Sequence, residues 1–270
     1  MSPPIVGADR LTADPCPVVV DTRWYPDGRD ARVAYEAGHV PGAVHVHLDR
    51  WLAGPPAEAG GRHPMPEPAV FAQGMSAAGV GDGAPVVACD DSGGVIAARL
   101  VWMLRALGED AALLDGWDGM LERGWVEPLP ATFTPRSWPA GMLASADDVA
   151  ALGMGTVLLD ARSRERYEGA PDELDPRPGH IPGARSLPCR ENLDRTGRLL
   201  PEDVLRARLA AVGVVPGGPD VVSSCGSGVT ACHTLLVLEH LGFPPGRLYP
   251  GSWSEWSRSG RPAVLGPSPR

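Results

Sequence analysis

The segment 225–230 has the residue types and spacing of a nucleophile loop. It follows the short β-branched run Val221–Val222 and opens a helical stretch, so a cysteine sulfur is expected where backbone N–H groups stabilise an anion. Two glycines let those N–H groups converge on one point, and two hydroxyls add donors. The loop predicts a thiolate nucleophile; a buried core cysteine beside a turn is the alternative. Its members are Cys225, Gly226, Ser227, Gly228, Val229 and Thr230.

The remaining cysteines give no sign of a scaffold. The five are odd in number, without CxxC spacing or a secretory signal, which argues against disulfides or structural zinc. At most one or two thiols are expected to carry chemistry. A redox role for Cys89 or Cys189 stays open, and Cys232, about two helical turns beyond Cys225, is expected in the core.

Charge and composition exclude several classes of protein. All 24 basic residues are arginine, so enzymes that need a lysine, such as Schiff-base, PLP and Walker-type proteins, are excluded. The net charge of −9 without a basic block argues against nucleic acid or anionic membrane as a partner. His45 and His47 lack a third ligand nearby, so a metal site is not expected. No cofactor is expected either. No apolar run is long enough to span a membrane, and a cytoplasmic location is expected.

The 270 residues carry the same pattern twice. Four anchors recur in the same order at offsets of 134 to 141 residues, which indicates a duplicated domain. We expect domain 1 at 1–126, a proline-rich linker at 127–140 and domain 2 at 141–270. The anchors pair Val18–Asp21 with Val157–Asp160, Gly38–Ala43 with Gly179–Ala184, Asp91 with Cys225, and Leu113–Gly116 with Leu248–Gly251.

Each half alternates short β-branched runs with helical stretches. Runs that are apolar throughout suit strands buried on both faces, so each half is predicted to be an α/β domain with a mostly parallel sheet flanked by helices. Ligands bind such sheets where strands give way to helices. The first copy has Asp91 at the position expected for the nucleophile, so it is predicted to be catalytically inactive.

The chain resembles the two-domain rhodanese family of sulfurtransferases from Val18 to about Pro262, and the Cys225 loop is similar to that of the 3-mercaptopyruvate branch. Thiosulfate-preferring relatives typically carry an arginine after the cysteine, where this chain has Gly226. The resemblance implies two tandem rhodanese-like domains, the first inactive. It rests on segments 21–25, 28–32, 102–105, 160–162 and 251–253, both GH[VI]PGA motifs and the Cys225 loop.

The same resemblance implies further site residues. Arg166 matches an arginine that holds the substrate carboxylate, and Arg177 is the second candidate for that clamp. Asp30 and His39 match positions that would form a proton relay with Ser227. Because GHVPGA recurs at His180, a structural hydrogen bond is the competing interpretation of His39.

These expectations combine into a two-step sulfur transfer. The Cys225 thiolate takes sulfur from 3-mercaptopyruvate, or alternatively from thiosulfate, and the persulfide passes it to cyanide or to a thiol such as thioredoxin. A phosphatase would need Cys-x5-Arg, but Ala231 stands six residues after Cys225. A non-catalytic persulfide carrier would need the same loop and remains an alternative.

Overall fold

The chain forms two compact units in a computed structural model that describes residues 1–171 and 173–267. Unit 1 comprises Met1–Gly54, Pro66–Pro139 and Arg195–Arg198, and unit 2 comprises Pro55–Met65, Ala140–Asp194 and Leu199–Arg270. The sequence predicted a single boundary at 127–140. The structure adds an exchange of two short segments, because each half of the chain contributes one to the unit built mainly from the other half.

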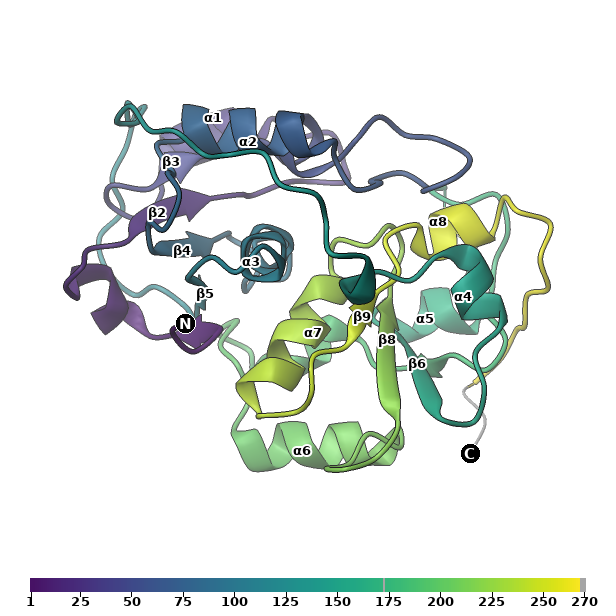
Figure 1. The fold of residues 1–270 in the computed structure, drawn as a ribbon. Coiled ribbons are helices and arrows are strands. Elements are labelled where there is room, and N and C mark those ends of the chain that lie inside the picture. Colours follow the sequence, from purple (N-terminus) through teal and green to yellow (C-terminus); the bar gives the residue numbers. More distant parts are fainter. Residues whose placement is uncertain (172, 268–270) are drawn as a thin grey trace. The chain divides into compact units, whose positions relative to one another are not determined.

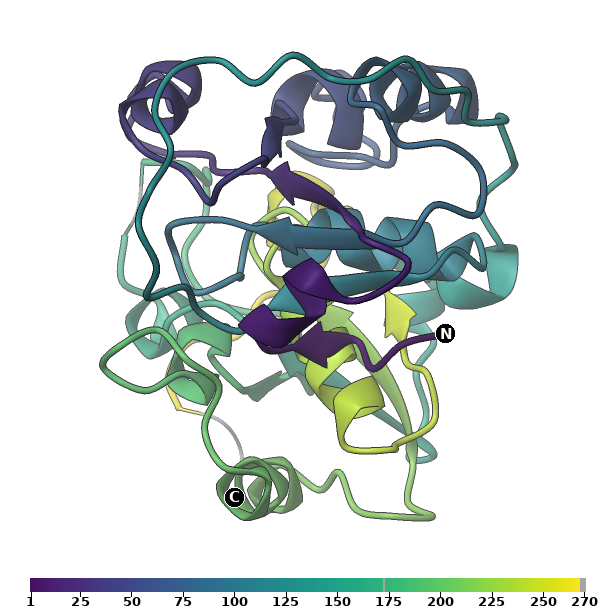
Figure 2. The same ribbon diagram turned by 90° about the vertical axis from the view of Figure 1, so that its left-hand side faces the viewer.

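Unit 1 contains a five-stranded, all-parallel sheet in the order β1-β5-β4-β2-β3. Its central strands are runs of valine, alanine and leucine, whose side chains are buried on both faces, as a covered parallel sheet requires. Figure 2 shows these strands beside one another. The strands are β1 Ile5–Val6, β2 Val18–Asp21, β3 Val44–His45, β4 Val86–Cys89 and β5 Ala111–Leu114, and the helices are α1 Ala31–Ala37, α2 Pro68–Ala77 and α3 Ala98–Ala106.

Unit 2 contains a four-stranded parallel sheet in the order β7-β6-β8-β9. In Figure 1, α6 and α7 lie on one side of β6 and β8, and α4, α5 and α8 lie on the other. The strands are β6 Thr156–Asp160, β7 Arg185–Ser186, β8 Asp220–Ser224 and β9 Arg247–Leu248. The helices are α4 Ala146–Ala150, α5 Arg164–Glu168, α6 Glu202–Ala211, α7 Ala231–His240 and α8 Ser252–Trp256.

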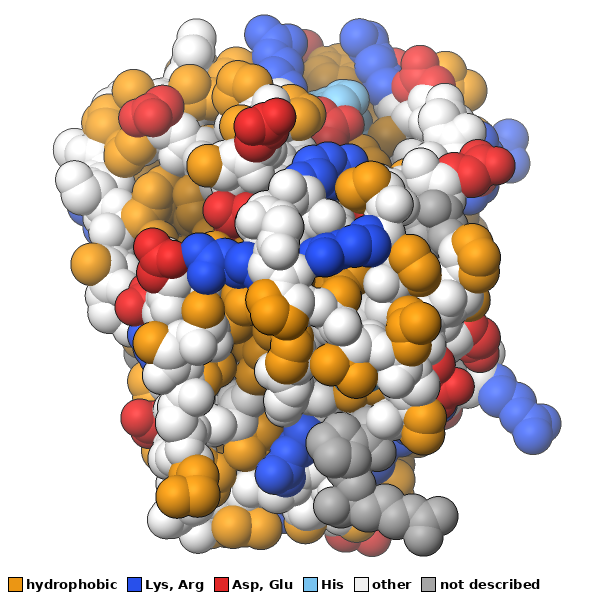
Figure 3. Space-filling view, turned by 90° about the vertical axis from the view of Figure 1, so that its right-hand side faces the viewer, with side chains coloured by type: hydrophobic (Ala, Val, Ile, Leu, Met, Phe, Trp, Pro, Cys, Tyr) orange, Lys and Arg blue, Asp and Glu red, His pale blue; other side chains and the backbone are white. Residues whose placement is uncertain are grey.

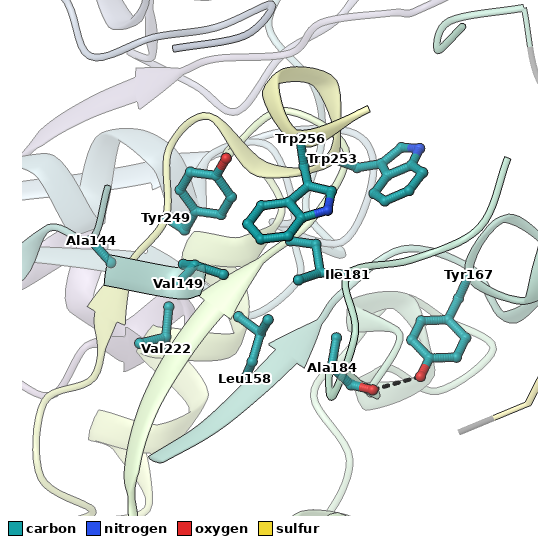
Figure 4. Close-up of a cluster of buried hydrophobic side chains, with 10 residues drawn as sticks. All are labelled: Ala144, Val149, Leu158, Tyr167, Ile181, Ala184, Val222, Tyr249, Trp253 and Trp256. Atoms are coloured by element: carbon teal, nitrogen blue, oxygen red, sulfur yellow. Dashed lines mark hydrogen bonds between the residues drawn. The ribbon is translucent and has the colours of Figure 1, made fainter. Parts of the chain in front are cut away.

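One hydrophobic core of unit 2 lies between its sheet and the helices α4, α5 and α8 (Figure 4). Leu158 and Val222 are paired in register on β6 and β8, and they belong to one cluster with aromatic residues of α5 and α8. Helix α4 is fixed by a capping box in which Ser145 and Asp148 satisfy each other's backbone N–H groups. The cluster comprises Ala144, Val149, Leu158, Tyr167, Ile181, Ala184, Val222, Tyr249, Trp253 and Trp256.

The proline-rich segment expected to be a linker packs against unit 1. Phe133 is 3% exposed, its ring lies 5.7 Å from that of Phe71, and Trp138 lies 5.1 Å from the same ring. The Trp138 Nε1–H also donates to the Pro66 carbonyl at 2.7 Å. Residues up to Pro139 therefore belong to unit 1.

The duplicated sequence produces duplicated geometry. His39 and His180 each lie against a tyrosine ring, with centroids 4.0 and 3.7 Å apart, and each forms an Nδ1 hydrogen bond with that tyrosine's carbonyl at 2.9 Å. The tyrosine hydroxyls donate to the carbonyls of Ala43 and Ala184, both at 2.6 Å. The repeated GH[VI]PGA motif is thus a structural device in both units.

Strand register corrects one pairing between the copies. Asp21 pairs with Cys89 in unit 1, and its counterpart Asp160 pairs with Ser224 in unit 2. The next residue along each strand is Asp90 in one copy and Cys225 in the other. Asp90, and not Asp91 as predicted, therefore stands at the position of the cysteine.

The face drawn in Figure 3 carries arginine side chains scattered among acidic and hydrophobic ones. Within residues 1–171 and 173–267, no helix combines the length and the hydropathy needed to cross a bilayer.

A buried histidine predicts acid sensitivity. Burial in α7 lowers the pKa of His233 from 6.5 to about 4, so between these pH values the unfolded chain binds a proton that the folded chain does not. The free energy of unfolding should fall as pH is lowered through this window, by about 3 kcal/mol from this group. His233→Gln should remove that part of the slope in urea unfolding between pH 7 and 4. His240→Gln, at the partly exposed end of α7, should keep it; equal slopes for both variants would contradict the assignment.

Candidate active site

Cys225 lies at the carboxyl end of β8, where the strand gives way to the loop before α7. Its side chain is buried, and the backbone N–H of Gly228 donates to its Sγ at 3.1 Å. The loop thus aims a main-chain dipole at the sulfur, as the sequence predicted. An N–H donor stabilises negative charge on sulfur, either as a thiolate or as the end of a persulfide.

The segment before and within α8 holds this loop in place. The Cys225 N–H donates to the Ser252 hydroxyl at 3.0 Å, and that hydroxyl donates to the Tyr249 carbonyl at 2.8 Å. The carbonyls of Cys225 and Gly226 accept from Trp253 N–H at 3.0 Å and Ser254 N–H at 2.8 Å. These bonds engage the loop carbonyls with α8, while the Gly228 N–H faces the sulfur.

Ser227 is paired with a histidine that lies far away in sequence. His63 Nδ1 lies 2.7 Å from the Ser227 Oγ, and both residues are buried. They belong to the same unit, because Pro55–Met65 is part of unit 2. A histidine hydrogen-bonded to a hydroxyl one residue beyond Gly226 can move a proton beside the nucleophile.

Asp30 and His39 have other partners than the predicted relay. The Asp30 carboxylate accepts from the N–H groups of Arg32 and Val33 and caps α1. His39 is fully buried in the tyrosine stack of unit 1. The histidine hydrogen-bonded to Ser227 is His63, whereas Asp30 and His39 have these partners within unit 1.

Arg166 lies beside the loop, as the resemblance implied. Its Nη2 donates to the buried Asp175 carboxylate at 3.2 Å. A Cβ placed on Gly226 would lie 3.4 and 3.5 Å from its two terminal nitrogens. The glycine thus lets this guanidinium approach the backbone next to Cys225.

Arg177 donates to backbone carbonyls. Its Nη2 donates to the carbonyls of Trp256 at 3.2 Å and Arg261 at 2.8 Å, and its guanidinium carbon lies 6.0 Å from the centre of the Trp253 ring. These bonds tie the segment before His180 to the residues that follow α8. Arg177 therefore crosslinks these two segments, and its predicted place in the clamp stays a prediction.

Two other cysteines of unit 2, Cys189 and Cys232, interact with residues of the Cys225 loop. Val229 is buried, and Thr230 interacts with Cys189, whose thiol pKa is raised to about 12 by burial. Burial also raises the pKa of Cys89 well above its ordinary value. Cys232 donates to the Gly228 carbonyl at 3.4 Å. Protonated thiols are poor nucleophiles.

The corresponding loop of unit 1 is filled by its own carboxylate. Asp90 accepts from the N–H groups of Ser92 and Gly94 at 2.7 Å and of Ile96 and Ala97 at 2.8 Å. Burial raises the pKa of this carboxyl, while the four N–H groups oppose that rise. Asp91 instead accepts a hydrogen bond from the Tyr25 hydroxyl. Unit 1 therefore keeps the anion-binding loop and supplies the anion itself.

His63 and Arg62 lie outside the predicted set of site residues. Both come from 55–65, a stretch rich in proline and glycine without helical or strand periodicity. The only signal there was a histidine and an arginine side by side in a segment that the repeat does not match. Within residues 1–171 and 173–267, no cluster of three or more His, Cys, Asp or Glu side chains could hold a metal ion.

Comparison with known proteins finds similarity along nearly the whole chain. The profile of the rhodanese-like domain matches residues 8–120 and 145–259. The "Probable 3-mercaptopyruvate sulfurtransferase" of Pseudomonas aeruginosa is 39% identical over 270 residues, covering 93% of this chain and 94% of that protein. "Thiosulfate/3-mercaptopyruvate sulfurtransferase 2" of Arabidopsis thaliana is 30% identical over 302 residues, covering 98% and 87%. The crystal structure of SseA, a 3-mercaptopyruvate sulfotransferase from Escherichia coli, matches with a TM-score of 0.77 and 34% identity, covering 94% of this chain and all of that one.

The two loop glycines predict different costs of substitution. Gly228 has φ +75°, and a Cβ there would lie 2.4 Å from the Pro250 carbonyl oxygen, so Gly228→Ala should cost about 1–3 kcal/mol in urea unfolding. It should also slow alkylation of Cys225, because the N–H on the sulfur moves. Gly226→Ala would meet only the ends of two arginine side chains and should cost less than about 1 kcal/mol. Equal losses for the two variants would contradict this account.

Proposed function

Because the chain belongs to the rhodanese family, with two rhodanese-like domains in tandem, we propose that it transfers sulfur from 3-mercaptopyruvate to an acceptor through a persulfide on Cys225. The observation that carries the proposal is the Cys225 loop. A buried sulfur accepts the Gly228 N–H, and an arginine beside Gly226 can hold a carboxylate. The chain is thus a sulfurtransferase, and its second unit is the catalytic one.

The first step loads the enzyme. The Cys225 thiolate attacks the thiol sulfur of 3-mercaptopyruvate, an S–S bond forms, and the C–S bond breaks with its electron pair going to carbon. The proton of the donor thiol ends on that carbon, which becomes the methyl group of pyruvate. One thiolate and one mercaptopyruvate anion give one persulfide anion and one pyruvate anion, so charge and atoms balance.

The second step returns the enzyme to its starting state. Cyanide attacks the outer sulfur, the S–S bond breaks, and thiocyanate leaves while Cys225 regains its thiolate. A thiolate acceptor would attack the same outer sulfur, and the Cys225 thiolate would leave as the acceptor gains a persulfide. In a dithiol acceptor such as thioredoxin, the second thiol would then form a disulfide and release the sulfur as hydrogen sulfide. Between the steps the Gly228 N–H stabilises the persulfide charge, and the two half-reactions predict ping-pong kinetics.

The Ser227–His63 pair can carry the proton of the first step. The thiol proton of the donor must leave sulfur and reach carbon as the C–S bond breaks. A serine hydroxyl beside the nucleophile, hydrogen-bonded to a buried imidazole at 2.7 Å, offers both an acceptor and a donor for it. Thiosulfate carries no such proton, so its sulfur transfer does not need the pair.

Two other functions use the same loop. Thiosulfate is a second candidate donor, and the Arabidopsis relative carries both donors in its name. Thiosulfate would leave as sulfite, and Arg166 beside Gly226 could bind its charge. A persulfide carrier without turnover is the more remote alternative, and steady-state kinetics separates it from an enzyme.

Cys225→Ser should abolish turnover and leave the fold intact. The hydroxyl replaces the sulfur in a preformed loop but forms no persulfide, so the added mass of one sulfur atom should disappear from the intact protein after incubation with donor.

Initial rates with cyanide as acceptor should show a higher kcat/KM for 3-mercaptopyruvate than for thiosulfate. Retained turnover in the serine variant would rule out Cys225 as the nucleophile. A higher kcat/KM for thiosulfate would overturn the assignment of 3-mercaptopyruvate as the donor. Wild-type protein that forms the persulfide but does not turn over would favour the persulfide-carrier alternative.

Ser227→Ala should slow loading in a donor-specific way. Loss of proton transfer should reduce the rate of pyruvate release from 3-mercaptopyruvate by about 100-fold, since general acid–base catalysis contributes about 10²–10⁴-fold. Loading from thiosulfate and discharge of the preformed persulfide by cyanide should change little. His63→Gln should follow the same pattern. Equal slowing with both donors would show that the pair only supports the loop.

A further inference from the structure

A buried carboxylate gathers arginines next to the Cys225 loop. The side chain of Asp175 is 2% exposed, and it forms ion pairs with Arg62, with Arg166 at 3.2 Å and with Arg258 at 3.7 Å. Asp175 is thus shared by three arginines among the residues that the structure describes. The side chains of Arg62 and Arg166 are 22% and 28% exposed, so they are accessible while their charges are only partly screened by water.

Arg62 reaches the same point beside Gly226 as Arg166. Its Nη1 donates to the Leu174 carbonyl at 2.9 Å and to Asp175, which fixes the plane of the guanidinium. Its Nη2 lies 3.2 Å from the position of a Cβ on Gly226, while the terminal nitrogens of Arg166 lie 3.4 and 3.5 Å from that position. Two guanidiniums therefore converge on one point beside the residue that follows the nucleophile.

The backbone around Arg62 fixes this position. The Arg62 N–H donates to the Ser254 hydroxyl at 3.0 Å, and that hydroxyl donates to the Gly251 carbonyl at 2.9 Å. Ser254 N–H in turn donates to the Gly226 carbonyl at 2.8 Å. The next residue is His63, the partner of Ser227. One short segment thus delivers a cation and an imidazole to the loop.

We propose that Arg62 is the second arm of the site that binds the carboxylate of the donor, paired with Arg166. The inference rests on the proposed function and concerns donors that are short 2-oxo acids. Two guanidiniums that converge from different segments can bind both oxygens of one carboxylate. An arginine side chain at position 226 itself would instead fill the space where these two guanidiniums meet. Asp175 acts as a positioning residue, because it orients both guanidiniums through its ion pairs with them.

The test compares two donors that differ only in the carboxylate. Mercaptoacetone keeps the thiol and ketone of 3-mercaptopyruvate but has a methyl group in place of the carboxylate. Arg62→Gln keeps a donor for the Leu174 carbonyl and removes the charge, Arg62→Lys keeps the charge, and Arg62→Ala removes both. Arg164→Ala is the matched control, since Arg164 lies on α5 two residues before Arg166 and pairs with the exposed Glu191.

Arg62→Gln and Arg62→Ala should lower kcat/KM for 3-mercaptopyruvate by about 10–100-fold, mainly through KM, as loss of a charged hydrogen-bond partner does. Both should change kcat/KM for mercaptoacetone and persulfide discharge by cyanide less than about threefold. Arg62→Lys should recover part of the loss. Pyruvate should inhibit the loading of Cys225 from thiosulfate, and its inhibition constant should rise more in Arg62→Gln and Arg62→Ala than in Arg62→Lys. Arg164→Ala should resemble wild type in all of these measurements.

Equal losses with both donors would overturn the inference, because Arg62 would then only hold the loop. An unchanged kcat/KM for 3-mercaptopyruvate in Arg62→Gln would overturn it as well. Wild-type protein that fails to load from 3-mercaptopyruvate would overturn the proposed function instead, and this outcome is seen before any Arg62 variant is measured.

Discussion

A buried ion pair at the end of β6 connects several parts of unit 2. The Arg162 guanidinium donates to Asp160 at 2.7 Å and to the Gly179 carbonyl at 2.8 Å, and it lies over the Trp253 ring at 4.9 Å. The Trp253 N–H holds the Cys225 carbonyl. Removing one partner of such a pair leaves an unpaired buried charge at a cost of about 3–5 kcal/mol. The Arg162–Asp160 ion pair therefore links the end of β6 with the GHIPGA motif and, through Trp253, with the Cys225 loop.

Unit 1 repeats this ion pair without the chemistry. Arg23 donates to Asp21 and to the Gly38 carbonyl, as Arg162 does to Asp160 and the Gly179 carbonyl. What differs is the residue that follows the central strand. In unit 1 four N–H groups donate to the Asp90 carboxylate, whereas in unit 2 the Gly228 N–H donates to the Cys225 sulfur. The same backbone framework supports both, because the anion site is made of main-chain donors.

Much of this arrangement is predictable from the sequence because it depends on local patterns. Apolar β-branched runs predict the buried parallel strands, and a cysteine between a strand and glycines predicts the nucleophile. The Asp91 pairing was wrong because it was aligned on the helix ends at Gly108 and Gly242. Asp90 lies 18 residues before the first, but Cys225 lies 17 before the second, so the alignment slipped by one.

The residues that sequence could not identify are those whose role depends on long-range contacts. His63 and Arg62 lie in a segment without periodicity, and only tertiary packing brings them to a loop more than 160 residues away. The same dependence on long-range contacts explains why the sequence did not predict the hydrogen-bond partners of Arg177 and His39. Their types suit a clamp or a relay, but backbone carbonyls that only the fold supplies have engaged them.

The exchange of segments between the units has a genetic consequence. A duplicated gene begins as two copies that can each fold alone, and cutting it at the proline-rich segment would be expected to restore them. Here the second half on its own would carry Cys225 and Arg166 but lack residues 55–65, which belong to its unit. The first half would likewise lose Arg198, which donates to the Asp115 carbonyl at 2.8 Å. Cutting the chain at the proline-rich segment would therefore remove from each unit one segment that belongs to it.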